Sequence, residues 1–200
     1  MKRKTISTFS LWLASGFIIL IAMAAQAQNV IKIQTPTDGN GNYAVAMAKL
    51  ALSKIENNYK IELIDSNTYT QARSLEEVAA GNMDIMWTAT DQELEDKLLP
   101  IRIPLYKGLL GHRIFIIRKG DQARFNRVRN FDDLKQFKFG QGTTWADSKI
   151  LAANGLTVIK AMKYESLFHM LDGNRFDAFP RGVQEPWAEI ASHPGLPLAA

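Results

Sequence analysis

The chain has 200 residues, of which 46% are hydrophobic, 24 are Lys or Arg and 20 are Asp or Glu. It contains no cysteine, which excludes disulfide stapling, thiolate metal sites and a lipid-modified N-terminal cysteine. The formal net charge is +4, and three of the basic residues stand at positions 2 to 4.

The N-terminal segment predicts an export signal. The charged start "MKRK" precedes the apolar "LWLASGFIILIAMAAQAQ", which contains Ala25-Gln26-Ala27. This layout is typical of a signal peptide cleaved after Ala27, and an uncleaved membrane anchor is the alternative. Removal of residues 1–27 would lower the formal net charge from +4 to +1. We therefore expect a periplasmic or secreted protein and no nucleic-acid partner.

The first half of the remaining chain alternates predicted strands and helices. The runs "VIKIQTP" (30–36) and "YKIELID" (59–65) indicate strands, while "NYAVAMAKLALSKIEN" (42–57) and "QARSLEEVAAGN" (71–82) have helical spacing. The compact run "MDIMWTAT" (83–90) predicts a buried strand. Two strand-helix-strand passes favour a parallel sheet with helices on its faces.

The pattern changes at Leu98. Residues 98–121 are extended and interrupted by Pro and Gly, so we expect strands that cross between two lobes. A second α/β unit follows. It has predicted helices in 131–136, 145–155, 164–174 and 183–192, and predicted strands in 137–142, 157–162 and 175–180. We predict lobe 1 with its hinge strand over 28–117 and lobe 2 over 118–200.

The turn "GQGTTWAD" (140–147) connects a predicted strand to a predicted helix. It lacks the lysine of a phosphate loop and the spacing of a dinucleotide loop. The start of a helix nevertheless favours an anion, because its backbone N–H groups are unpaired. Thr143 or Thr144 could instead simply cap the helix, and the two roles are compatible.

Catalytic signatures are weak in this sequence. His112, His169 and His193 are scattered without metal-ligand spacing, and no Gly-x-Ser-x-Gly motif occurs. We predict no metal, no cofactor and no enzymatic activity. Arg181 falls near the end of a predicted strand, where it could clamp a carboxylate or form a surface salt bridge.

The order of these motifs resembles the type II periplasmic solute-binding proteins, in particular the family 3 proteins of amino-acid transporters. The segment "LFHMLDGNRFDAFPRG" resembles the family's helix followed by Leu-x-x-Gly-Arg/Lys-x-Asp-Ala, "FGQGTTWAD" its glycine-threonine turn, and "VAAGNMDIMWTAT" a segment of its first lobe. The resemblance covers most of residues 30–193. No single motif is specific, and the order of the motifs carries the comparison.

The resemblance implies a two-lobe α/β fold with mixed sheets, helices on both faces and a cleft that closes on a small ligand. Gly142, Thr143 and Thr144 match the turn that holds a ligand carboxylate. Trp87, Thr88 and Thr90 match a loop that contacts ligand, although Trp87 could also be a buried aromatic.

The sequence departs from the family in three places. The usual Thr-x-x-Arg reads "TATDQELED" here, so the carboxylate-binding arginine is absent, and Arg73, Arg102 or Arg181 could replace it. The aspartate expected to hold an amino group is replaced by Arg181-Gly182, which favours an acidic or otherwise anionic solute. The chain stops at "PGLPLAA", before elements that would complete lobe 1, so we expect a truncated product with exposed sheet edges and low stability or association.

Three functions remain open at this point. We expect a monomeric receptor that captures a small polar or anionic, amino-acid-like solute for an ABC-type transporter permease. A ligand-sensing protein for a membrane signalling partner is the first alternative. An enzyme of dehydratase or lyase type is the second, with Asp147, Glu165 and Asp177 as its candidate acids or bases.

Overall fold

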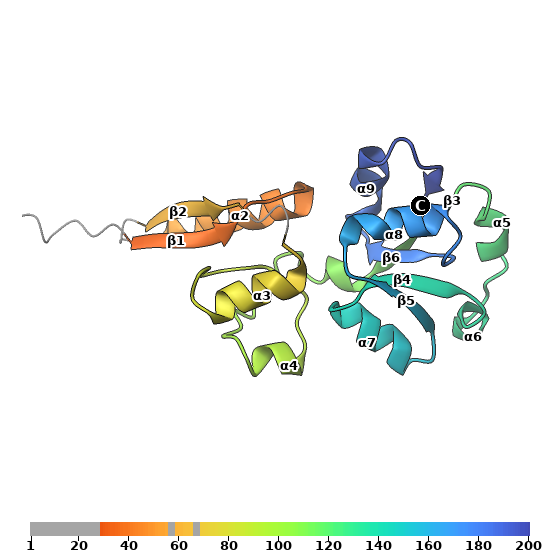
Figure 1. Cartoon of the computed structure of the whole chain (residues 1–200), viewed down its shortest axis with the longest axis horizontal. Helices are drawn as coiled ribbons and strands as arrows, with labels where there is room; N and C mark the ends of the chain where they lie inside the picture. The colour runs from red at the N-terminus through yellow and green to blue at the C-terminus, as the bar shows by residue number, and fades with distance from the viewer. Residues whose placement is uncertain (1–28, 56–58, 66–68) are drawn as a thin grey trace, which may run out of the picture.

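The computed structural model describes residues 29–55, 59–65 and 69–200. The segment predicted as an export signal, residues 1–27, lies outside this part. Two α/β lobes stand side by side, with the N-terminal lobe on the left of Figure 1. Within the described residues, no helix has the length and apolar character needed to cross a membrane.

Lobe 1 is built on two parallel strands. β1 (Asn29–Gln34) and β2 (Tyr59–Ile64) pair in register, with Ile31 opposite Ile61. The helices of this lobe are α2 (Gly39–Leu52), α3 (Gln71–Ala79) and the short α4 (Gln92–Glu95). The core of lobe 1 is small and includes Ile33, Val45 and Met83.

The strand predicted over 83–90 is wrong except at one residue. Ile85 forms an isolated parallel bridge with Ile33, and residues 86–90 form no strand. α2 also begins three residues before the predicted helix, because Asp38 caps it by accepting a bond of 2.7 Å from the Gly41 N–H. Residues of both regions line the space between the lobes.

Lobe 2 contains the longer run of elements. In chain order they are the 3-10 turn η1 (Leu109–Gly111), β3 (Arg113–Arg118), α5 (Gln122–Phe125), α6 (Phe131–Leu134), β4 (Lys138–Gly142), α7 (Ala146–Ala153), β5 (Thr157–Ala161), α8 (Tyr164–Asp172), β6 (Phe179–Gly182), α9 (Pro186–Ser192) and β7 (Leu198–Ala199). α4, α5 and β7 were not predicted. The sequences of α4 and α5, with four residues each, and of β7, with two, show no periodic pattern.

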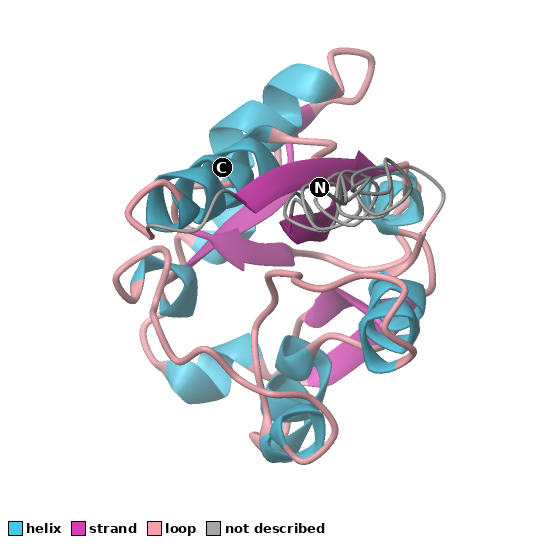
Figure 2. Ribbon diagram, turned by 90° about the vertical axis from the view of Figure 1, so that its left-hand side faces the viewer, coloured by secondary structure: helices cyan, strands magenta, loops and turns pink. Residues whose placement is uncertain are grey.

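The sheet of lobe 2 is mixed. β4 and β5 are parallel, whereas β3 lies antiparallel between β6 and β7. A bridge from Phe139 to Ala178 joins the two groups of strands. β3, which we expected as the hinge strand of lobe 1, therefore hydrogen-bonds only to strands of lobe 2 among the described residues. Figure 2, seen from the lobe 1 side, shows helices around the strands, as an α/β fold predicts.

The core of lobe 2 includes one face of α8, which lies within the helix predicted in 164–174. Leu167, Phe168 and Leu171 are fully buried against β3 and β6. Phe176 packs its ring directly on Gly140, where an added Cβ would lie 2.1 Å from a ring carbon. A side chain at position 140 is therefore excluded, and this close approach holds β4 against the segment that leads into β6.

Candidate functional site

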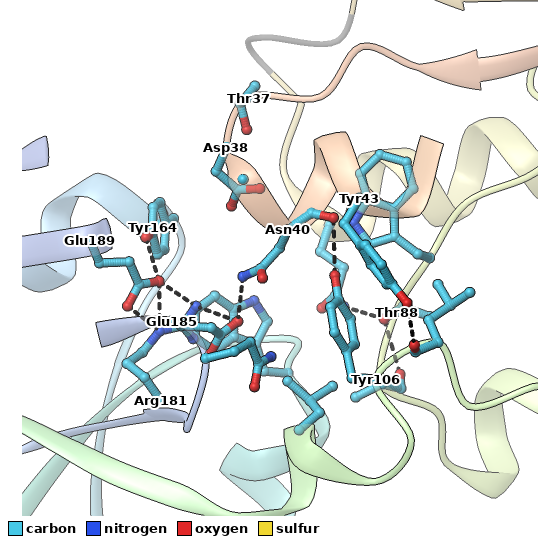
Figure 3. Close-up of a pocket in the computed structure, with 18 of the residues that line it drawn as sticks. Thr37, Asp38, Asn40, Tyr43, Thr88, Tyr106, Tyr164, Arg181, Glu185 and Glu189 are labelled. Carbon is cyan, nitrogen blue, oxygen red and sulfur yellow. Dashed lines mark hydrogen bonds and ion pairs between the residues drawn. The ribbon is translucent and has the colours of Figure 1, made fainter. Parts of the chain in front are cut away.

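A cleft of about 1090 Å³ separates the two lobes, and side chains from both lobes line it. Lobe 1 contributes the loop after β1 and the start of α2. The segment between the lobes contributes Tyr106 and Lys107, and lobe 2 contributes α8, α9 and the end of β6. Figure 3 shows these side chains converging from opposite walls. A cleft between lobes is a common position for a small-molecule site.

The lobe 1 wall depends on a tight turn before α2. Gly41 lies so close to Pro36 and Trp87 that an added Cβ would be 3.0 Å from each. The Asp38 side chain caps α2, and Asn40 extends from its first turn across the cleft. Glycine at 41 thus lets the turn approach Trp87 while Asp38 and Asn40 line the cleft.

Two tyrosines form an aromatic face beside this turn. The rings of Tyr43 and Tyr106 lie 5.4 Å apart, and each hydroxyl donates to a backbone carbonyl, Tyr43 to Leu105 and Tyr106 to Asn40. Burial raises the pKa of Tyr106 to about 12, with a further contribution from the charges of Asp38 and Glu185. Tyr106 therefore remains a neutral hydrogen-bond donor at physiological pH.

The lobe 2 wall is centred on a buried ion pair. Arg181 donates from Nε and Nη2 to Glu189, with Nε 2.9 Å from Oε2 and Nη2 2.6 Å from Oε1. Arg181 Nη2 also lies 3.1 Å from Glu185 Oε1, and the Tyr164 hydroxyl donates to Glu189 at 2.7 Å. Burial alone would lower the pKa of Arg181, but the two carboxylates raise it, so the guanidinium stays charged. Arg181 thus uses its Nε and Nη2 donors within the protein.

Aromatic rings surround the same guanidinium. The Arg181 Cζ atom lies 4.9 Å from the Phe179 ring centroid, 5.0 Å from Trp145 and 5.5 Å from Tyr164. Such contacts stabilise a desolvated cation. Together with the carboxylates they fix Arg181 in one position at the base of the cleft.

Glu185 is the lobe 2 carboxylate that reaches lobe 1. Its Oε1 accepts a bond of 3.1 Å from the Asn40 side-chain amide, and its Oε2 accepts from the Gly182 N–H at 2.6 Å. Burial raises the pKa of Glu185 more than the nearby Arg181 lowers it. The Asn40–Glu185 bond is a direct hydrogen bond across the cleft.

A second set of contacts between the lobes lies on another side. Lys149 of α7 donates to Asp91 and to Glu93, each at 2.8 Å, and Thr144 donates to Gln71 at 3.4 Å. These residues, apart from Gln71, line a smaller pocket of about 390 Å³. Direct contacts therefore join the two lobes on two sides of the molecule.

The predicted ligand residues do not all lie in one site. Trp87, Thr88 and Arg181 line the large cleft. Thr143 and Thr144 line the smaller pocket instead.

The other predicted ligand residues lie outside both pockets. Gly142 is buried beneath the Trp145 ring. Thr90 donates to Glu95, and Arg73 is exposed and paired with Glu76 and Glu77 on its own helix.

The remaining candidate arginine, Arg102, and the cleft residue Arg113 also have carboxylate partners. Arg102 pairs with Glu95, and Arg113 donates to Asp147 at 2.7 Å. Asp147 stands in the first turn of α7, so a carboxylate of the protein already faces the helix start that we expected to accept an anion.

The candidate acids and bases are likewise engaged. Asp147 pairs with Arg113, and Glu165 Oε2 lies 2.9 Å from His193 Nε2. Asp177 accepts from Arg124 and from the Lys138 N–H and does not line the cleft. In the described part of the chain, no group of three His, Cys, Asp or Glu side chains could hold a metal ion.

Several cleft residues were missed by sequence reasoning. They are Asp38, Asn40, Tyr43, Tyr106, Glu185 and Glu189. The signal for the first two was present in "TPTDGNGN", because an Asp before Gly-Asn-Gly is typical of a helix cap near a close backbone approach. No local pattern pointed to the others.

No protein-family model and no curated protein matches the sequence. Solved structures do match in fold. An ancestral arginine-binding protein bound to arginine has a TM-score of 0.56 and 15% identity, covering 87% of this chain and 79% of its own. A periplasmic binding protein of Salmonella typhimurium with high arginine specificity has a TM-score of 0.56 and 14% identity, covering 86% and 76%.

The GluR0 ligand-binding core from Nostoc punctiforme, in complex with L-glutamate, has a TM-score of 0.54 and 13% identity, covering 84% of this chain and 75% of its own. All three neighbours are described by the ligands that they bind. The predicted fold class is confirmed: this chain has the fold of the type II periplasmic solute-binding proteins.

Proposed function

We propose that this protein captures a small, polar, amino-acid-like solute in the cleft between its lobes and delivers it to an ABC-type transporter in the membrane. The observation that carries the proposal is the cleft itself, about 1090 Å³ in volume and lined from both lobes by aromatic and charged side chains. The neighbours in fold, named for binding arginine and glutamate, support a solute of amino-acid size.

The contacts between the lobes suggest how capture works. A ligand that touches both walls stabilises the closed arrangement, because it binds that arrangement better than an open one. The Asn40–Glu185 bond and the Lys149 ion pairs are the protein's own contribution to closure. Delivery to a transporter, in the periplasm, is the role that we infer for the closed complex.

Binding can be tested with the full chain, expressed for export and purified. A panel of L-amino acids, amines, guanidines and dicarboxylates is screened by thermal shift, and the hits are measured by calorimetry. We expect at least one solute to raise the melting temperature and to give saturable heat. A folded protein that binds none of the panel would contradict the proposal.

A matched pair of variants locates the site. Ala188 is an exposed residue of α9 that lines the cleft, whereas Ala123 is an exposed residue of α5 outside it. Ala188→Trp should block binding and Ala123→Trp should not. Equal loss in both variants would show that the solute binds elsewhere.

A sensing role is the second candidate, favoured by the fold similarity to the GluR0 ligand-binding core. A strain without the gene separates the two functions. The transporter role predicts lost uptake of the radiolabelled solute found in the screen, and normal uptake would favour sensing. An enzyme is a weaker candidate, because Asp147, Glu165 and Asp177 are all held by basic partners.

A further inference from the structure

The cleft is acidic on balance. Five carboxylates line it, those of Asp38, Asp147, Glu165, Glu185 and Glu189. Three basic side chains line it, those of Lys107, Arg113 and Arg181. The formal charge of this lining is therefore −2 with His193 neutral, which raises the local concentration of cations rather than anions.

The ion pairs within this lining leave Asp38 and Glu185 with the least compensating positive charge. Arg113 is paired with Asp147, and Arg181 donates two bonds to Glu189. In the residues that the structure describes, no Lys or Arg forms an ion pair with Asp38. Glu185 shares Arg181 with Glu189, and the charge of Arg113, which is itself paired with Asp147, acts on Glu185 only from a distance.

Asp38 and Glu185 face one region of the cleft from opposite lobes. Asn40, two residues after Asp38, donates directly to Glu185. Both carboxylates lie close enough to Tyr106 to influence its hydroxyl, and Figure 3 shows them on two sides of the same space. A cation bound there would contact a carboxylate of each lobe and would favour closure.

The neighbouring surfaces suit an organic cation. The Tyr43–Tyr106 pair and Trp87 line the cleft next to this space, and aromatic faces attract ammonium and guanidinium groups.

A dedicated site for an α-carboxylate is missing from the described lining. Arg181 donates from Nε and Nη2 to carboxylates of the protein, and Arg113 donates from Nη2 to Asp147. Arg73 and Arg102 lie outside the cleft. Lys107 is exposed and supplies a single flexible charge in place of a bidentate clamp. Recognition of a free amino acid by its carboxylate therefore has little support in this cleft.

We propose that the solute is a small organic cation, an amine or guanidine, whose positive group lies between Asp38 and Glu185 and whose binding does not require an α-carboxylate. This inference rests on the proposed solute-binding function. It reverses the sign of charge that the sequence alone suggested.

The test compares three probes on the full chain by calorimetry: agmatine, which is arginine without its carboxylate, L-arginine and L-glutamate. We expect agmatine to bind at least as tightly as L-arginine, and L-glutamate not to bind at the same concentrations. Asp38→Asn and Glu185→Gln should each weaken agmatine binding by about tenfold to a hundredfold, the usual effect of losing a charged hydrogen bond. Asp132→Asn, which removes an exposed charge of α6 outside the cleft, should leave it unchanged.

Both substitutions are chosen to preserve the fold. Asn caps a helix as well as Asp does, and the side-chain amide introduced by Glu185→Gln would keep an oxygen that can accept from the Gly182 N–H. Melting curves of each variant check this, and Asp38→Asn carries the test alone if Glu185→Gln unfolds.

The other outcomes separate this inference from the proposed function. Binding of L-arginine without agmatine, or of L-glutamate without either, would overturn the cation inference and leave the solute-binding function standing. Failure of all three probes while another solute of the wider panel binds would do the same. If the folded protein binds no solute of the wider panel, both the cation inference and the solute-binding function are overturned.

Discussion

Lys149 of lobe 2 lies 2.8 Å from a carboxylate oxygen of Asp91 and 2.8 Å from one of Glu93, both in lobe 1. The side chains of Lys149 and Glu93 are well exposed, whereas that of Asp91 is 26% exposed. The two bonded carboxylates raise the pKa of Lys149, so the ammonium is charged throughout the physiological range. The contact is an ionic latch on the side of the molecule away from the Asn40–Glu185 bond.

Lys149→Met should weaken this latch without disturbing either core. Exposed ion pairs are screened by salt, so the wild-type protein should open as the salt concentration rises, and the variant should already be open at low salt. Small-angle scattering would report this as a larger radius of gyration. Solute affinity should fall by at most about fivefold. The control is Lys138→Met, at an exposed position of β4 outside both pockets. An identical salt response in wild type and Lys149→Met would refute the latch.

Arg181→Gln should destabilise the protein strongly. The substitution leaves the Glu189 carboxylate buried without its cation, and breaking a buried pair in this way typically costs about 3–5 kcal/mol. The double variant Arg181→Gln/Glu189→Gln removes both charges and should recover a large part of that loss. Urea unfolding followed by circular dichroism measures both free energies. A stable Arg181→Gln protein with weakened solute binding would instead indicate that Arg181 serves the ligand.

The alternation of strands and helices could be predicted because it has a local signal. Leu167, Phe168 and Leu171 have the spacing of one helix face, and all three are buried in α8. The strand predicted over 83–90 has the same apolar character but finds a partner only at Ile85. Strand formation depends on a neighbouring edge far away in sequence, and composition does not supply that information.

The site was harder to predict for a similar reason. Asn40 and Glu185 meet across 145 positions of sequence, and their contact depends on how the lobes face each other. Arg181 could be placed at the end of a strand, but its partner Glu189 is determined by where α9 lies, packed beside β3. The sequence therefore indicated a charged group in the cleft without showing that the protein neutralises it.

Gly142→Ala should disturb the cleft by displacing the Trp145 ring. A Cβ at this position would lie 2.4 Å from an indole atom of Trp145, and Trp145 lines the cleft and stacks over Arg181. The indole must therefore shift, and overpacking of this kind costs about 1–3 kcal/mol. We expect a lower unfolding free energy, a changed tryptophan emission spectrum and weaker solute binding. Gly195→Ala, which meets no atom within 4 Å, should change none of them. An unchanged spectrum in Gly142→Ala would show that the turn adapts without moving the ring.

Glu165→Gln should remove a stabilisation that exists only at acid pH. Burial lowers the pKa of His193. The hydrogen bonds to the Glu189 carbonyl and the Glu165 carboxylate raise it by more than burial lowers it, so the pKa lies above its ordinary value. A raised pKa in the folded state adds stability that is complete below the unfolded value of about 6.5 and is lost as the pH rises through the folded value. Wild type should therefore melt about 2 °C above Glu165→Gln near pH ~5.5, and the difference should vanish near pH ~8.5. Glu62→Gln, at an exposed position of β2, should show no such pH dependence. A melting difference that persists unchanged at high pH would mean that Glu165 acts through packing, because neutral His193 no longer attracts its charge.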